Sequence, residues 1–250
     1  MKRIILSGCN GRMGHVLQKL IQKNPDLTVV AGIDRVPTDA AFPIYASAQE
    51  VQEDADIIID FSHYTAVPNL LAFALDKKIP VVVATTGLED KEKTLLKEAS
   101  QSIPVFYSAN MSLGINVLIK ALQAITPSVE ADFNIEIIEK HHNQKKDAPS
   151  GTALLLADSI NDVCDVKKDY VFGRSGNDNE NKLSEMGIHA VRGGTIPGEH
   201  TVIYAGDDEI IELKHTALSR DIFANGALKA GVFLADQSAG LYSMSDLLDA

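Results

Sequence analysis

Residues 2–23, KRIILSGCNGRMGHVLQKLIQK, decide the fold of the first half of the chain. Residues 2–7 are a short apolar run typical of a buried strand, and residues 13–23 carry apolar side chains at helical spacing. Between them lies the turn Gly8-Cys9-Asn10-Gly11-Arg12-Met13-Gly14. Glycines there permit a sharp bend and let backbone N–H groups approach a pyrophosphate at the positively polarised helix start. The stretch predicts a strand–turn–helix unit that binds a dinucleotide.

The spacing of these glycines is GxxGxxG rather than GxGxxG, so the pattern alone also fits a turn that needs glycine only for its geometry. The next apolar run, residues 27–33, ends at Asp34, twenty positions after Gly14. A carboxylate at that strand end suits the hydroxyls of an adenosine ribose, and Arg35 beside it suits a 2′-phosphate. Together these features favour a nicotinamide dinucleotide site that accepts NADH or NADPH.

Further apolar strands alternate with amphipathic helices up to about residue 110. Strands are predicted over residues 55–61, 80–84 and 104–107, and helices over residues 66–77 and 90–101. Strands that are apolar on both faces and separated by helices indicate a parallel sheet with helices on both sides. The first part of the chain is therefore predicted to be a Rossmann-type α/β domain.

Two polar segments follow the later strands of this predicted sheet. One is Thr85-Thr86-Gly87, and the other is Ser108-Ala109-Asn110-Met111. Ligands of open α/β sheets bind beyond the carboxyl ends of the strands, so both segments are candidates to flank a nicotinamide. Both also fit ordinary strand-to-helix loops in which Thr and Asn act as caps.

After residue 110 the pattern changes to strands that follow one another. Helices are expected over residues 115–125 and 151–163, and strands over residues 133–140, 187–191, 201–205 and 209–215, with a hairpin turn at residues 206–208. This order favours an α+β domain with a mixed, mostly antiparallel sheet. The polar residues 173–185 are expected to form a mobile loop, and the chain is expected to end in a helix over residues 222–235 and a short tail.

The segment Glu139–Asp147, EKHHNQKKD, concentrates three lysines and two of the seven histidines in nine residues. It is followed by Ser150, a good N-cap, and by Gly151 and Thr152, whose N–H groups would face an anion at a helix start. Imidazole and ammonium groups beside such a helix start suit a substrate with carboxylates, and they provide proton donors.

Two other interpretations of this segment remain open. Adjacent histidines also bind metals, but no Asp, Glu or Cys partners stand at evident ligand spacing, and the following lysines would repel a cation. The segment also fits a solvated basic loop. Further along, Arg192, His200 and Arg220 can add a guanidinium or an imidazole, although each residue alone is more typical of a structural role.

Composition excludes several classes of protein. The 250 residues include 23 Lys and Arg against 34 Asp and Glu, a net charge of −11, which disfavours binding to nucleic acid or to anionic membranes. The two cysteines, Cys9 and Cys164, form no CxxC pair, so neither a disulfide framework nor a zinc knuckle is predicted. No apolar run approaches the ~18 residues of a membrane span, and no signal-peptide pattern opens the chain. We expect a soluble, cytoplasmic protein.

Several motifs follow one another along essentially the whole chain. They are GCNGRMG at 8–14, TTG at 85–87, SANMSLGIN at 108–116, EKHHNQKKDAPSGTA at 139–153, RGGTIPGEHT at 192–201 and FANGA at 223–227. With these motifs the chain resembles the 4-hydroxy-tetrahydrodipicolinate reductases (dihydrodipicolinate reductases) of bacterial lysine biosynthesis. The pattern HHxxKxDAPSGTA is long and far more specific than any glycine-rich turn.

The resemblance implies a dinucleotide-binding domain formed by residues 1–112 and 222–250. Residues 113–221 would form an inserted domain for substrate binding and oligomerisation, whose sheet joins subunits into a homotetramer. The family reduces 4-hydroxy-tetrahydrodipicolinate to tetrahydrodipicolinate, with loss of water, in the diaminopimelate route to lysine. The reductant implied is NADH or NADPH, and no metal is implied.

The resemblance also assigns roles to individual residues. His141 would be the proton donor and acceptor and Lys145 a proton donor, while His142 and the helix start at Gly151 and Thr152 would hold the substrate's carboxylates. The residues that would line the dinucleotide are Gly8, Cys9, Asn10, Gly11, Arg12, Met13, Asp34, Arg35, Ala84, Thr85, Thr86, Ser108, Ala109, Asn110 and Met111. The chain departs from the family at Ala84, where many members have Gly, and at Met111, where Phe is frequent.

Two other functions stay open on the sequence. A related Rossmann dehydrogenase that acts on an amino or keto diacid would use the same basic segment. A nicotinamide-sensing binding protein without turnover would also carry the glycine turn, although paired proton donors argue against it.

Overall fold

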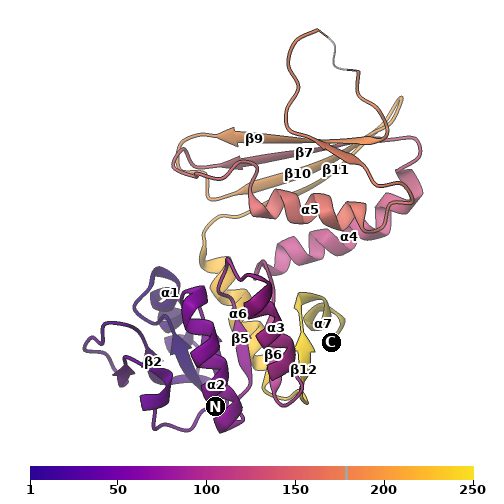
Figure 1. Cartoon of the computed structure of the whole chain (residues 1–250). Coiled ribbons are helices and arrows are strands. Elements are labelled where there is room, and N and C mark those ends of the chain that lie inside the picture. Colours follow the sequence, from indigo (N-terminus) through magenta and orange to yellow (C-terminus); the bar gives the residue numbers. More distant parts are fainter. Residues whose placement is uncertain (178–179) are drawn as a thin grey trace. The chain divides into compact units, whose positions relative to one another are not determined.

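The computed structural model describes residues 1–177 and 180–250 (Figure 1). The chain divides into two units, one formed by residues 1–113 and 221–250 and the other by residues 114–220. Each unit has its own sheet and its own apolar core.

The first unit is built on a seven-stranded sheet in the order β12-β6-β5-β4-β1-β2-β3, in which every pairing is parallel. Its strands are β1 (Lys2–Ser7), β2 (Leu27–Ile33), β3 (Ile44–Tyr45), β4 (Ile57–Asp60), β5 (Val81–Val83), β6 (Pro104–Tyr107) and β12 (Gly240–Tyr242). All residues of β4 and β5 are buried, which explains why these strands are apolar without alternation up to Asp60 at the end of β4.

Helices cover both faces of this sheet, as Figure 1 shows. One core packs β1 and β4 against α1 (Arg12–Gln22), α6 (Asp221–Leu234) and α7 (Met244–Asp249). The other packs the opposite faces of these strands against α2 (Val67–Lys77) and α3 (Asp90–Ala99), with single 3-10 turns at Ala48–Glu50 and Tyr64–Ala66. The predicted Rossmann-type architecture is confirmed.

The second unit carries a five-stranded sheet in the order β11-β10-β7-β9-β8. Its strands are β7 (Asn134–His141), β8 (Asp169–Val171), β9 (Glu185–Arg192), β10 (Glu199–Ala205) and β11 (Ile210–Thr216). Strand β10 pairs antiparallel with β7 and β11, whereas β9 pairs parallel with β7 and β8. This mixed sheet completes the predicted fold class.

One face of the second sheet packs against α4 (Leu113–Val129) and α5 (Gly151–Asn161). Side chains of β7 alternate between half-buried and buried, so Ile135 and Ile137 enter the apolar core. The same alternation puts Glu139 and His141 on the buried face, where the apolar core ends. A carboxylate and an imidazole therefore meet at the end of β7 that leads into the basic segment.

The structure differs from the sequence prediction in the C-terminal tail. The expected short tail contains β12 and α7, and β12 adds an edge strand beside β6. Strands β3 and β8 are also absent from the prediction, because runs of two or three residues carry too little periodicity to be recognised. Residues 178–179 of the predicted loop 173–185 lie outside the described residues, and Arg174 and Asn181 on either side bond to Glu136 of β7.

None of the helices within residues 1–177 and 180–250 is both long enough and apolar enough to span a bilayer.

Candidate active site

The glycine turn between β1 and α1 is packed too closely for side chains. Gly8 has a positive φ of 77°, and a Cβ there would lie 2.6 Å from the carbonyl oxygen of Phe61. A Cβ at Gly14 would lie 2.3 Å from the carbonyl oxygen of Cys9. These two glycines are therefore required by the fold of the turn itself.

Helix α1 begins beside this turn without a side-chain cap, because its N-cap residue is Gly11. Its first N–H groups have no partners within the helix and carry its positive dipole end. Gly8, Gly11, Asp34 and Arg35 line one cavity of about 350 Å³ at this helix start, together with Ser7, Ile33, Ala46, Phe61, Ser62, His63 and Ala66. The residues present suit a dinucleotide, since an uncapped helix start and a carboxylate face one space.

The other predicted residues of the turn act mainly on its shape. Cys9 is fully buried in the core, and burial raises the pKa of its thiol to about 11. The Asn10 N–H donates to the Asp34 carboxylate at 2.9 Å, and the Asn10 amide donates to the carbonyl of Val36 at 2.7 Å. Asn10 thus holds Asp34 and the segment after it against the turn. Met13 is half-buried against the core, and Arg12 is exposed at the helix start.

Thr85, the first Thr of the TTG motif, is buried, and its hydroxyl donates to the Asp60 carboxylate at 2.7 Å. Asp60 ends β4 and is fully buried. Burial raises the pKa of Asp60, although hydrogen bonds from Ser62, Thr85 and Ser7 offset part of this effect. Asp60 therefore joins the ends of β1, β4 and β5. Ala84 is buried beside Thr85, whereas Thr86 and Gly87 are exposed.

The segment 108–111 is also ordered by its own contacts. The Ser108 hydroxyl donates to the carbonyl of Asn110 at 2.9 Å, and the Asn110 side-chain oxygen accepts from the N–H of Ser112 at 2.8 Å. The Met111 side chain lies in the core. Helix α6 passes so near that a Cβ at Gly226 would lie 1.7 Å from the Met111 carbonyl oxygen. Ala109 is the exposed residue of this segment.

In the second unit the conspicuous feature is a buried cluster around Glu139. This side chain is fully buried and accepts a bond from His141 Nδ1 at 2.6 Å. Arg192 donates to both carboxylate oxygens, at 2.6 and 2.7 Å, and the Ser150 N–H donates at 3.0 Å. Burial would raise the pKa of Glu139, but these hydrogen bonds outweigh it, so that the pKa is lowered and the group is a carboxylate.

His141 is 8% exposed, and its pKa is lowered chiefly by burial. The bond to Glu139 opposes this effect, whereas the charges of Lys145 and Arg192 add to it. The ring lies 5.2 Å from the ring of His200 between centroids. His200 is buried and bonds through Nε2 to the Ser150 hydroxyl at 3.1 Å, and burial lowers its pKa to about 4, so it is neutral near pH 7.

A carboxylate already lies at the start of α5. Asp147 forms an ion pair with Lys145 Nζ at 2.9 Å. This hydrogen bond from Lys145 is the largest of the effects that lower the pKa of Asp147, and the Gly151 N–H at the start of α5 contributes in the same direction. Ser150 caps the helix by accepting from the Ala153 N–H at 3.1 Å. The predicted site residues Lys145 and Gly151 are thus brought together around an anion.

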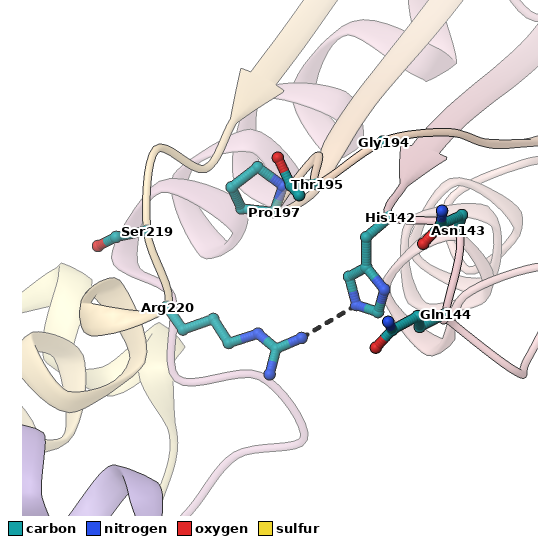
Figure 2. Close-up of a pocket in the computed structure, with 8 residues that line it drawn as sticks. All are labelled: His142, Asn143, Gln144, Gly194, Thr195, Pro197, Ser219 and Arg220. Carbon is teal, nitrogen blue, oxygen red and sulfur yellow. Dashed lines mark hydrogen bonds between the residues drawn. The ribbon is translucent and has the colours of Figure 1, made fainter.

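His142 points away from this cluster into a cavity of about 330 Å³, which Figure 2 shows. Arg220 reaches across the cavity, and its guanidinium lies 3.0 Å from His142 Nε2. The remaining lining residues are Asn143, Gln144, Gly194, Thr195, Pro197 and Ser219. The cavity thus carries an imidazole from the segment after β7 and a guanidinium from the last residue of the unit.

No group of three His, Cys, Asp or Glu side chains within the described ranges, 1–177 and 180–250, is placed to hold a metal ion. The two histidines of the basic segment instead face a buried carboxylate and a guanidinium.

A parallel sheet with an uncapped, glycine-lined helix start and a second unit with buried histidines beside a carboxylate are typical of a Rossmann-type oxidoreductase. The profile of "Dihydrodipicolinate reductase, N-terminus" matches residues 2–111, and that of "Dihydrodipicolinate reductase, C-terminus" matches residues 114–248. The chain belongs to the dihydrodipicolinate reductase family.

Known proteins similar to this chain agree with that assignment. The 4-hydroxy-tetrahydrodipicolinate reductase of Caldanaerobacter subterraneus subsp. tengcongensis is 54% identical over 99% of this chain and 98% of its own length. The enzyme of the same name from Clostridium tetani is 47% identical over 100% of this chain and 98% of its own length. The structure of a dipicolinate-bound dihydrodipicolinate reductase from Paenisporosarcina sp. TG-14 has the same fold, with a TM-score of 0.80 at 22% identity over 97% of both chains.

Sequence reasoning assigned no role to three acidic residues of these clusters, Asp60, Glu139 and Asp147. For Glu139 a signal was present, because a charged residue at a position of β7 that the alternation buries needs a partner. Asp60 follows an apolar run, and its sequence pattern is that of any strand that ends at a polar residue. Its bond to Thr85 depends on the neighbouring strand, which the sequence does not show.

We predict that replacing Asp60 changes the pH dependence of stability with a definite sign. The raised pKa means that ionisation of Asp60 destabilises the fold, so its contribution is present at low pH and lost as pH rises through that pKa. Asp60→Asn cannot ionise. Relative to wild type, the melting temperature of Asp60→Asn should therefore be more favourable at about pH 7 than at about pH 4.

Asp56→Asn is the matched control, because Asp56 precedes the same strand and a hydrogen bond from Arg3 lowers its pKa. Its stabilising contribution is present at neutral pH and lost as pH falls, so the variant's melting temperature relative to wild type should change with pH in the opposite direction. The same sign of pH dependence in both variants would contradict the assignment for Asp60.

Proposed function

We propose that the chain reduces 4-hydroxy-tetrahydrodipicolinate to tetrahydrodipicolinate in the diaminopimelate route to lysine. The reaction takes up one hydride and one proton and releases one water. A nicotinamide nucleotide supplies the hydride when it is bound in the first unit. The second unit holds the cyclic dicarboxylate and delivers the proton.

The observation that carries this proposal is the position of Asp147. Lys145 pairs with the Asp147 carboxylate near the start of α5, where the Gly151 N–H also favours the charged carboxylate, and a carboxylate is the group that the substrate would present. A substrate carboxylate that displaces Asp147 would bind the Gly151 N–H, with Thr152 next along the helix. The second carboxylate would be bound by His142 and Arg220 across their cavity.

Proton delivery falls to His141 or Lys145. His141 bonds to Glu139 through Nδ1, so Nε2 is the nitrogen that exchanges a proton with the substrate. Lys145 is held by Asp147 in this structure and is released for proton donation when Asp147 is displaced. His141 is the last residue of β7, and Lys145 lies on the segment between β7 and α5.

The cofactor is NADH or NADPH, bound at the turn between β1 and α1. The start of α1 at Gly11 and Arg12 would hold the pyrophosphate, and Asp34 would accept from the ribose. Thr86, Gly87 and Ala109 are the exposed residues of the two segments proposed to flank the nicotinamide. A reductase that draws on these nucleotides works in the cytoplasm, where we place the chain.

Removing either proton donor should lower turnover. His141→Gln and Lys145→Met should each reduce kcat on the order of 10²–10⁴-fold in an assay of nucleotide oxidation with freshly generated cyclic substrate, because a lost general acid costs that much. His189→Gln and Lys146→Met are the matched controls. His189 pairs with Glu136 rather than Glu139, and Lys146 is an exposed neighbour.

The controls should keep kcat within about twofold of wild type. Wild-type turnover in a protein that carries both His141→Gln and Lys145→Met would contradict the assignment of these two proton donors.

Arg35 should decide how well the chain accepts NADPH. It is exposed at the mouth of the cavity that Asp34 lines, where it would pair with a 2′-phosphate. Arg35→Ala should raise KM for NADPH on the order of 10-fold, equivalent to about 1.4 kcal/mol, and change KM for NADH little. Arg12→Ala, at the helix start, should weaken both nucleotides alike. Equal loss for both nucleotides in Arg35→Ala would mean that Arg35 does not bind the phosphate.

We further propose that the chain assembles as a homotetramer through the sheet of the second unit. The described helices of this unit pack on one face of that sheet, which leaves the opposite face for subunit contact. Sedimentation equilibrium should give a mass near four times 27.0 kDa at micromolar concentration. A mass of 27.0 kDa under the conditions of full activity would contradict the assembly.

A further inference from the structure

Glu139 joins the parts of the proposed substrate site that must keep a fixed distance from one another. Its carboxylate binds the imidazole of His141, the N–H of the helix cap Ser150 and the guanidinium of Arg192. Arg192 also donates to the carbonyl of Asp147 at 2.7 Å, which ties the end of the basic segment to the same point. One carboxylate therefore fixes the proton donor relative to the helix start that would bind the substrate.

Burying a carboxylate costs free energy, which explains why both oxygens of Glu139 have hydrogen-bond partners. An isolated carboxylate in an apolar interior is strongly unfavourable unless charges and hydrogen bonds compensate it. Arg192 supplies the opposite charge through two parallel hydrogen bonds. The Ser150 N–H and His141 Nδ1 each donate a further hydrogen bond to one of the two carboxylate oxygens. With that geometry the carboxylate has no freedom to rotate, so neither has the imidazole bonded to it.

The bond to Glu139 also selects the form of the imidazole. A carboxylate only accepts hydrogen bonds, so Nδ1 of His141 carries the proton, and Nε2 is the nitrogen that titrates. A Cβ at Gly198 would lie 3.0 Å from Nε2, so the absence of a side chain there leaves this edge of the ring uncrowded. The charged and titratable groups that face the ring are Glu139, Lys145, Arg192 and His200. Among them only Glu139 favours the protonated ring.

We propose that Glu139, held by Arg192, is a positioning residue that fixes the His141 imidazole with Nε2 directed to the substrate. The proposal rests on the proposed function, since it acts through His141 as a proton donor. It adds to that function the residue that sets the tautomer and the orientation of the donor.

Glu139→Gln tests the proposal with nearly unchanged shape. The amide oxygen can still accept from the Ser150 N–H, but the amide nitrogen donates to Nδ1 and so imposes the opposite tautomer on His141. We expect kcat to fall roughly 10²-fold with a smaller change in KM, since proton transfer rather than binding is impaired. The limb of the pH profile at which kcat declines with rising pH should move to lower pH, because the variant lacks the charge that favours protonated His141.

Glu136→Gln is the matched control. Glu136 stands three residues earlier on β7, on its opposite face, and bonds to His189 Nε2 at 2.6 Å and to Arg174 at 2.9 Å. The control thus breaks the same kinds of bonds in the same strand, and it should leave kcat and the pH profile unchanged. Glu139→Asp keeps the charge and should recover part of kcat and return the pH limb toward wild type.

A measurement on the wild-type chain makes the test independent of whether Glu139→Gln folds. In protein labelled with ¹⁵N-histidine, the neutral form of His141 should show the proton on Nδ1, with the resonance assigned by its loss in His141→Gln. A proton on Nε2 in the wild-type chain would overturn the proposal.

The failure of this proposal is distinguishable from failure of the proposed function. If wild type shows no nucleotide oxidation with the cyclic substrate, the proposed function is wrong, and the ¹⁵N spectrum still tests the tautomer. If wild type is active and His141→Gln is not, while Glu139→Gln keeps wild-type kcat and pH profile, Glu139 does not position the donor.

Discussion

The buried pairing of Glu139 with Arg192 and His141 is the interaction on which the second unit's chemistry depends. A fully buried carboxylate is tolerable only with its partners in place, so the fold of β7, β9 and the start of α5 must bring them together. The same requirement fixes the imidazole relative to the helix start. Stability and positioning thus rest on one set of hydrogen bonds, and a fixed imidazole is a consequence of satisfying a buried charge.

In the first unit, too, hydrogen bonds to carboxylates at the ends of the parallel strands order the adjacent backbone. Asp60 is buried between the ends of β4 and β5 and is satisfied by the Thr85 hydroxyl, which orders the loop that leads to exposed Thr86. Asn10 similarly ties the glycine turn to Asp34. In both places a polar side chain orders the backbone, while the neighbouring residues Thr86 and Arg35 remain exposed.

The sequence predicted the features that depend on residues close together along the chain, and it did not predict those that depend on residues far apart in sequence. The strand–turn–helix unit at residues 2–23 and the basic segment ahead of α5 depend on neighbours along the chain, and their patterns identified both. Asp60 and Arg192 act through strands far apart in sequence, so their partners appear only in the folded chain. The prediction of a short tail without strands was wrong because β12 has only three residues and is ordered by its pairing with β6. Asp147 was overlooked because the ligand expected at the helix start was external, whereas the chain supplies its own carboxylate.

The central claim is that a dicarboxylate replaces Asp147 at the start of α5 and meets His141 Nε2, which Glu139 orients. A crystal structure of the chain with dipicolinate tests it most directly. We predict that one ligand carboxylate lies on the N–H groups of Gly151 and Thr152, that Asp147 has moved off Lys145, and that His141 Nε2 is within about 2.6–3.2 Å of the ligand or of one bridging water. A ligand bound elsewhere, with Asp147 still on Lys145 and Gly151, would contradict the account.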